Sequence, residues 1–166
     1  MRNLKVIFLD VDGVLNSKDD LMIYRERNNI TSCILYDEVE DRPLKLLKEI
    51  VEKTNAKIVV SSSWRIGCCR SGKESIFGDR LYIKLENRLK DYGMDIYDIT
   101  PSLDSGTQRG DEIREWISKN PVDNFIILDD DSDMCEYLNT EHFIHTTYEH
   151  GLTEELKDKA IDFLSK

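Results

Sequence analysis

The stretch LKVIFLDVDGVLN, residues 4–16, decides the fold, because a buried strand in it leads directly into two acidic residues. Five of its first six residues are apolar, which is typical of a central strand with neither face in water. Asp10 and Asp12 follow with one residue between them, and Gly13 comes next. A strand that delivers two carboxylates to its own end predicts a chemical site at that end.

Outward from this stretch, strands and helices are predicted to alternate along the chain. Apolar runs predict strands at 4–10, 57–61, about 94–99, 124–129 and 142–146. Apolar spacing near 3.6 predicts helices at about 43–53, 80–91, 109–119 and after Thr153, with a weaker one near 132–138. This alternation predicts a parallel five-stranded sheet covered on both faces, a three-layer α/β/α sandwich of the Rossmann-like type.

The composition predicts one soluble domain over residues 1–166, with 40% hydrophobic and 34% charged residues. A net charge of −10 argues against a broad basic face that coats nucleic acid, although it leaves room for a local basic pocket. No apolar run reaches the roughly 18 residues of a membrane span. The cysteines lack C-x-x-C spacing, so we expect no zinc and free thiols in a reducing cytoplasm. A monomer is the default expectation.

Three polar clusters follow three of the predicted strands. Asp10 and Asp12 end the first strand, serines 61–63 and then Arg65 end the second, and aspartates 129–131 end the fourth. In open α/β sheets, ligands bind beyond the carboxyl ends of the strands, near the point where the strand order reverses. We therefore expect the three clusters to form one site at that edge.

The chemistry open to these residues is narrow. Carboxylates packed at one point repel one another and stay ionised only beside a compensating cation. Oxygen ligands without histidine or thiolate favour Mg²⁺. One carboxylate can then attack phosphorus, and a second, two residues on, can move the protons. Gly13 would let the backbone turn sharply between strand and loop.

Four motifs resemble those of the haloacid dehalogenase-like (HAD) superfamily, and they occur in its order. DVDGVLN (10–16) resembles the first motif, KIVVSSSWR (57–65) the second, Arg109 in TQRGDEIREWI the third, and FIILDDDSDM (125–134) the fourth. Together with GLT (151–153), they resemble one branch in particular, the phosphatase-like domain of Swiss-army-knife RNA repair proteins.

The resemblance implies a Mg²⁺-dependent phosphatase that works through a covalent aspartyl phosphate. Asp10 would be the nucleophile and Asp12 the general acid and base. Ser61 would hold a phosphate oxygen, with Ser62 as a live alternative because the serines are consecutive. Arg109 would stabilise the charge on the phosphoryl group.

The resemblance also implies a metal-binding set. Mg²⁺ would contact the Asp10 carboxylate and the backbone carbonyl of Asp12. Asp130 would be the main ligand from the fourth motif, with Asp129 assisting. Substrate contacts are expected from Gly13, Ser62 and Arg65. Two roles stay open at Asp133, in the metal shell or at a helix N-terminus, and Trp64 is expected in the core.

Two segments lie outside the predicted sandwich. Residues 17–42 would form a flap or small cap, which carries Arg25 and Arg27. Residues 64–80 hold four basic and two acidic side chains and would form a loop over the site. Together the two segments would cover the site with basic side chains, an arrangement called the basic roof below. Such a cover suits a small phosphorylated metabolite, a nucleotide or a nucleic-acid end.

Other readings of the acidic motifs are a receiver-like signalling domain, a non-catalytic phosphate-binding domain and a calcium-binding loop. A receiver places its phosphate-accepting aspartate on a central strand other than the first, and here the third strand offers only Asp98. An EF-hand loop from Asp129 would need glycine and glutamate where Met134 and Thr140 stand, so that reading fails.

Overall fold

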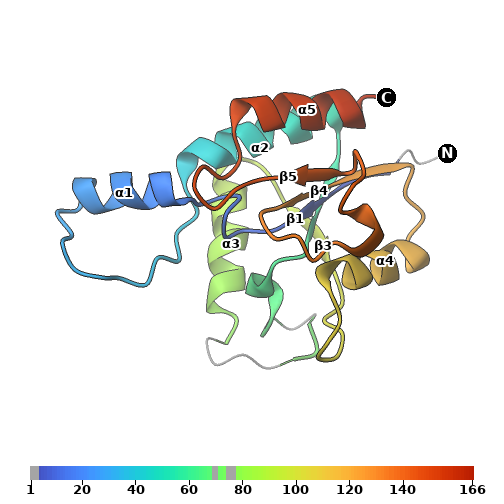
Figure 1. The fold of residues 1–166 in the computed structure, drawn as a ribbon, viewed down its shortest axis with the longest axis horizontal. Helices are drawn as coiled ribbons and strands as arrows, with labels where there is room; N and C mark the ends of the chain where they lie inside the picture. Colours follow the sequence, from blue (N-terminus) through green and yellow to red (C-terminus); the bar gives the residue numbers. More distant parts are fainter. Residues whose placement is uncertain (1–3, 69–70, 74–77) are drawn as a thin grey trace.

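The structure is a computed structural model that describes residues 4–68, 71–73 and 78–166 (Figure 1). Parts of the predicted loop 64–80, namely 69–70 and 74–77, lie outside the described residues. The strands are β1 (Lys5–Leu9), β2 (Lys57–Val60), β3 (Ile96–Ile99), β4 (Asn124–Asp129) and β5 (Phe143–His145). The helices are α1 (Lys18–Arg27), α2 (Asp41–Thr54), α3 (Arg80–Asp91), α4 (Arg109–Lys119) and α5 (Glu154–Leu164), with short 3₁₀ turns η1 (Ser63–Arg65) and η2 (Cys135–Tyr137).

The strands form one parallel sheet in the order β3-β2-β1-β4-β5. β1 is the central strand, and its residues from Val6 to Leu9 are fully buried because both of its faces are covered. From β1 the chain moves to β2 and β3 on one side and returns to β4 and β5 on the other. The strand order therefore reverses between β1 and β4, which confirms the predicted α/β architecture. In open α/β sheets, ligands bind at the carboxyl ends of the strands beside such a reversal.

Alternate residues of β1 face two different cores. Ile7 and Leu9 pack in a cluster with buried residues of α2, α3 and α5, whereas Val6 and Phe8 pack with residues of α4. Figure 1 shows α2 and α5 side by side over one face of the sheet and α4 on the other. This alternation gives the predicted three layers. Among the described residues, no helix is long and apolar enough to cross a bilayer.

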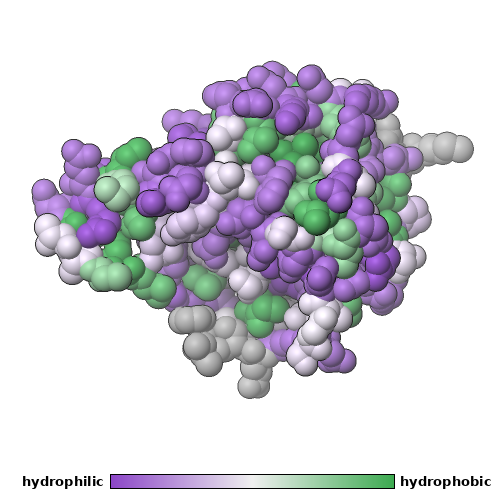
Figure 2. Space-filling view, in the orientation of Figure 1, coloured by the Kyte–Doolittle hydropathy of each residue, from purple (hydrophilic) through white to green (hydrophobic). Residues whose placement is uncertain are grey.

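The helix α1 was not predicted, because its sequence has no apolar periodicity. It is stabilised at its ends instead: the Ser17 hydroxyl accepts from the Asp20 N–H at 3.1 Å, and acidic and basic residues occupy its first and last turns. Figure 1 shows α1 and the loop after it extending from the body, and Figure 2 shows apolar patches on this extension, where Met22, Ile23 and Leu35 are exposed.

The start of α1 is nevertheless tied to the body of the molecule. The Arg42 guanidinium of α2 donates two hydrogen bonds to the buried Asp20 carboxylate, at 3.1 and 3.0 Å. It also donates to the carbonyl oxygen of Leu152 at 2.6 Å. Because a buried carboxylate needs a charged partner, this contact anchors the projecting segment at its base.

Candidate active site

The central strands each lead into a polar residue, and the register brings these residues together. Leu9 pairs with the last residue of β2 and with Leu128 of β4. The ladder continues by one bond beyond these pairs: the Asp10 N–H donates to Leu128 O at 3.0 Å, and the Ser61 N–H donates to Leu9 O at 2.9 Å. Asp10, Ser61 and Asp129 therefore lie side by side at the carboxyl edge of the sheet.

Three carboxylates gather at this edge. Oxygens of Asp10, Asp129 and Asp130 lie within 4.8 Å of one another. Burial raises the pKa of Asp129 to about 8, and the neighbouring Asp10 carboxylate adds to that rise. Burial also raises the pKa of Asp10 to about 6, although the Arg109 guanidinium and a hydrogen bond from Ser62 oppose the rise. The cluster is thus short of positive charge.

The donor set of this cluster fits a hard divalent cation. The group contains carboxylate oxygens only, the ligands that Mg²⁺ prefers. One oxygen of Asp129, Oδ2, is buried and has no hydrogen-bond partner in the described part of the chain. A buried carboxylate oxygen without a partner carries a desolvation cost that a cation would offset.

Gly13 gives Asp130 its place in the cluster. The glycine has a φ of +75°, and a Cβ atom on it would lie 2.2 Å from Asp130 Oδ2. The hydroxyl of Thr146 donates to the Gly13 carbonyl oxygen at 2.7 Å and holds this turn. The predicted sharp turn is present, and the absence of a side chain also makes room for a carboxylate.

Asp12 lies outside the carboxylate cluster, on the exposed side of the turn. Its carboxylate accepts one hydrogen bond from Asn16 Nδ2 at 3.0 Å and another from Trp64 Nε1 at 2.9 Å. Trp64 is buried in the core as expected, but its indole contact was not foreseen. Asn16 was also missed, although it lies inside the first motif.

The serines after β2 have different partners. Both side chains are fully buried. The Ser62 hydroxyl hydrogen bonds to Asp10 and accepts from the Trp64 N–H at 3.2 Å. The Ser61 hydroxyl has no hydrogen-bond partner among the residues that the structure describes. Ser62 thus holds the carboxylate of the predicted nucleophile, and Ser61 is the serine with an uncommitted hydroxyl.

Arg109 begins α4 beside the cluster, with its Nε atom 3.8 Å from Asp129 Oδ2. Asp133 Oδ2 accepts from the Arg109 N–H at 3.1 Å, so Asp133 lies at the helix N-terminus, one of the two roles that the sequence left open. A Cβ atom on Gly110 would lie 2.4 Å from the Met134 carbonyl oxygen. The glycine therefore lets α4 approach the loop after β4 and brings the Arg109 guanidinium to the site.

Over residues 6–156, the chain matches the family described as the HAD domain in Swiss Army Knife RNA repair proteins. The chain belongs to this HAD family. The match confirms the resemblance of the four motifs and places the domain in a superfamily of phosphatase-type hydrolases. Comparison with curated proteins and with solved structures gave no match.

In this HAD domain, Arg65 does not have the geometry expected of a substrate contact. Its side chain is only 3% exposed, and a guanidinium has five N–H groups. They donate to the carbonyl oxygens of Ser61, Ser62, Thr100 and Pro101 and to Glu112 Oε2 at 2.7 Å. With every N–H engaged inside the protein, Arg65 joins the loops after β2 and β3 to α4.

The basic roof expected over the HAD site is also engaged within the chain. Arg25 donates to the carbonyl oxygens of its own loop, at Ile30 and Thr31. Lys73 donates to the Leu103 carbonyl oxygen at 2.8 Å. Arg70, which the prediction also included, lies outside the described residues. Arg80 pairs with Asp37 at 2.6 Å, and the Arg27 guanidinium lies 5.7 Å from the centroid of the Tyr24 ring. These described side chains thus contact other parts of the chain, and Arg109 is the arginine that pairs with a carboxylate of the cluster.

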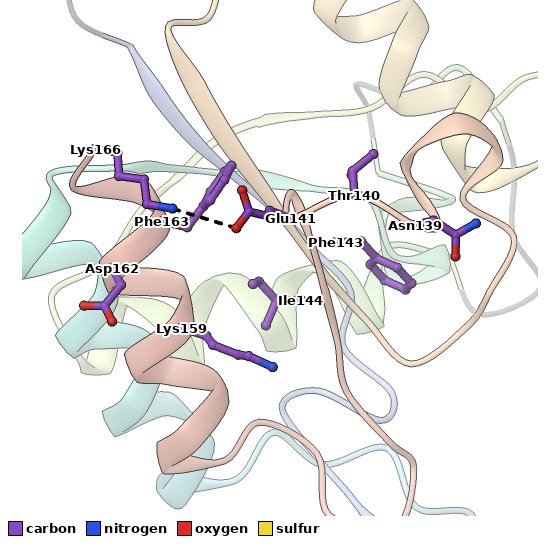
Figure 3. A pocket seen from close by; sticks show the side chains of 9 residues that line it. All are labelled: Asn139, Thr140, Glu141, Phe143, Ile144, Lys159, Asp162, Phe163 and Lys166. Atoms are coloured by element: carbon purple, nitrogen blue, oxygen red, sulfur yellow. Dashed lines mark ion pairs between the residues drawn. The ribbon is translucent and has the colours of Figure 1, made fainter.

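A separate pocket of about 450 Å³ lies at the opposite end of the HAD sheet (Figure 3). Its walls come from the amino end of β5 and the last turns of α5, with Phe143 and Phe163 among the lining residues. Lys166 pairs with Glu141 across it at 3.8 Å. The carboxylate cluster lies at the carboxyl ends of the strands, so this pocket is not part of the candidate site.

Proposed function

We propose that this HAD domain is a Mg²⁺-dependent phosphatase that hydrolyses phosphomonoesters through a covalent phosphate on Asp10. The observation that carries the proposal is the cluster of Asp10, Asp129 and Asp130 carboxylates within 4.8 Å at the strand-order reversal. Arg109 adds a cation beside it. The carboxylates would hold a cation, and that cation and the guanidinium together would offset the negative charge of a transferring phosphoryl group.

The metal would be held by the carboxylates of Asp10, Asp129 and Asp130 and by the backbone carbonyl of Asp12. When bound, Mg²⁺ supplies positive charge that offsets the charge on the phosphoryl oxygens. The Arg109 guanidinium would stabilise the same oxygens from its place at the start of α4.

The reaction would proceed in two halves on this chain's residues. In the first, an Asp10 oxygen attacks phosphorus while Asp12 gives a proton to the leaving oxygen, so that an alcohol departs and an aspartyl phosphate forms. In the second, Asp12 takes a proton from a water molecule whose oxygen attacks phosphorus. Inorganic phosphate leaves, and the Asp10 carboxylate is restored.

We extend the proposal to a nucleotide or a nucleic-acid terminal phosphate as the substrate. The support is the family description, which places related domains in RNA repair proteins. The net charge of −10 and the engaged basic side chains argue that a nucleic acid would be bound through its end and not along a basic face. Residues 17–42 would act as a small cap beside that end.

The alternative of a receiver-like phosphate acceptor has less support. Asp98, the candidate acceptor, lies on the edge strand β3. Its Oδ2 accepts from Trp116 Nε1 at 2.8 Å, so the carboxylate is committed to a contact with α4. A non-catalytic phosphate-binding domain would use the same cluster without turnover.

The test is hydrolysis of p-nitrophenyl phosphate with and without Mg²⁺, comparing the wild type with Asp10→Asn. We expect turnover that needs Mg²⁺ and that Asp10→Asn abolishes. Asp95→Asn, at an exposed position away from the site, makes the same chemical change and should leave turnover intact. Turnover that survives Asp10→Asn would overturn the nucleophile assignment. Oligonucleotides with 3′- or 5′-phosphates then test the substrate.

A further inference from the structure

Both oxygens of the Asp12 carboxylate are held by side-chain N–H groups. Asn16 Nδ2 donates to Oδ1 at 3.0 Å, and Trp64 Nε1 donates to Oδ2 at 2.9 Å. Trp64 is 52 residues away in sequence, so the contact depends on the tertiary fold. An exposed aspartate would otherwise exchange freely between its rotamers.

The two donors are themselves fixed. The Trp64 side chain is 2% exposed within the larger core, and its backbone N–H donates to Ser62 Oγ. Asn16 is 1% exposed, its Oδ1 accepts from the Gly13 N–H at 3.1 Å, and its Nδ2 also donates to the Glu38 carbonyl oxygen at 3.0 Å. A group held by packing and by further hydrogen bonds can define the orientation of the carboxylate it contacts.

We propose that Trp64 and Asn16 are positioning residues that hold the Asp12 carboxylate in the orientation needed for proton transfer. The inference rests on the proposed phosphatase function, in which Asp12 protonates the leaving oxygen. Neither side chain hydrogen bonds to the carboxylates of Asp10, Asp129 or Asp130 in the described part of the chain. The Trp64 indole N–H donates to Asp12, whereas Asn16 contacts both Asp12 and the Gly13 N–H, so Trp64→Phe is the more selective variant.

Positioning of a proton donor should matter in proportion to the basicity of the leaving group. A dinitrophenolate departs without a proton, whereas an alkoxide needs one as the bond breaks. The parameter kcat/KM reports the steps up to departure of the leaving group, so it isolates this proton transfer from hydrolysis of the aspartyl phosphate.

The experiment compares kcat/KM for 2,4-dinitrophenyl phosphate and for an alkyl phosphate in the wild type, Asp12→Asn, Trp64→Phe and Asn16→Ala, all with Mg²⁺. For Trp64→Phe we expect a loss of roughly 10- to 100-fold with the alkyl ester and less than about threefold with the dinitrophenyl ester. Asn16→Ala should show the same pattern, and Asp12→Asn a larger version of it.

The matched control is Trp116→Phe. Trp116 is also buried, at 3% exposure, and its Nε1 also donates to an aspartate, Asp98, but on the other face of the sheet. The same loss of an indole N–H there should leave the ratio of the two kcat/KM values unchanged. Thermal melting of each variant identifies any that fail to fold, and Asn16→Ala decides the matter if Trp64→Phe is one of them.

Each result has a distinct meaning. Equal losses for both esters in Trp64→Phe and Asn16→Ala, or no loss, would overturn the positioning role while leaving the phosphatase function in place. A wild type that hydrolyses neither ester would instead refute the proposed function. Selective loss with the alkyl ester, absent in Trp116→Phe, would support the inference.

Discussion

Gly13 lies under the carboxylate of Asp130, and its backbone has a φ of +75°. Two separate physical demands meet at this residue. The left-handed backbone disfavours any residue with a Cβ atom, by about 1–2 kcal/mol. In addition, the space that a Cβ would need is occupied by Asp130 Oδ2. A glycine at this place therefore serves both the turn and the carboxylate cluster.

We predict that Gly13→Ala weakens Mg²⁺ binding more than its loss of stability explains, because the new methyl group displaces Asp130. Gly93→Ala is the matched control: Gly93 has a φ of +74°, and nothing lies within 4 Å of its Cβ position. Both variants should lose about 1–2 kcal/mol of stability from backbone strain, and Gly13→Ala should lose more because its methyl group also meets the Asp130 carboxylate. Calorimetric titration with Mg²⁺ should show weaker binding in Gly13→Ala alone, and equal affinity in the two variants would contradict the prediction.

The Ser61 side chain ends in a buried hydroxyl that has no hydrogen-bond partner among the described residues. Its removal in Ser61→Ala should leave the free energy of unfolding within about 1 kcal/mol of wild type or raise it, because no intramolecular hydrogen bond is lost. Phosphatase turnover should fall, because a hydrogen bond to the phosphoryl group would be missing. Urea denaturation and steady-state kinetics measure the two effects, and a clear loss of stability with full activity would show that the hydroxyl is structural.

At the scale of elements, the site depends on how α4 and the loops after β2 and β3 are joined. The buried Arg65 guanidinium connects them, because it donates to carbonyl oxygens of both loops and to the Glu112 carboxylate of α4 at 2.7 Å. The Glu112 carboxylate also accepts from the Leu103 N–H at 3.1 Å. The N-terminus of α4, where Arg109 lies, is thereby tied to the loop that carries the two serines.

We predict that Arg65→Lys lowers the free energy of unfolding by about 2–4 kcal/mol, because an ammonium has three N–H groups and leaves buried carbonyl oxygens without donors. Activity should fall as well, since the serine loop loses its support. Arg114→Lys is the control: Arg114 also pairs with a carboxylate, Glu136 at 2.9 Å, but it is 53% exposed and should cost less than about 1 kcal/mol. Similar losses in both variants, measured by urea denaturation, would argue against the buried joint.

At the scale of the whole molecule, the strand order concentrates negative charge at one edge. The three carboxylates of the cluster come from the ends of the central strands β1 and β4, which hold the core together. A cation that neutralises the cluster should therefore stabilise the entire domain, because it binds the folded chain and not the unfolded one.

We predict that Mg²⁺ at about a hundredfold its Kd adds ~2.7 kcal/mol of stability, which is roughly 5–10 °C in Tm for a domain of this size. Addition of EDTA should reverse the shift. Asp129→Asn and Asp130→Asn should lose it, whereas Asp95→Asn should retain it. A Tm that does not respond to Mg²⁺ in the wild type, measured by calorimetry, would contradict the metal site.

The amino-acid sequence alone determined the sheet, its parallel character and the edge at which the polar residues meet. These features depend on local signals: apolar runs of strand length, helical spacing, and the residue that follows each strand. The polar clusters after β1, β2 and β4 could be read in this way, because parallel strands bring their carboxyl ends to one edge. The roles of individual site residues stay predictions.

Only the tertiary structure decided what each polar side chain contacts. The sequence could not show that Trp64 reaches Asp12 over 52 residues or that Arg65 reaches Glu112 over 47, because such hydrogen bonds leave no periodic pattern. The helix α1 was missed for a related reason, since its stability comes from end caps and from Arg42 and not from an apolar face. Local patterns determine which elements form, and long-range contacts determine which side chains remain free for chemistry.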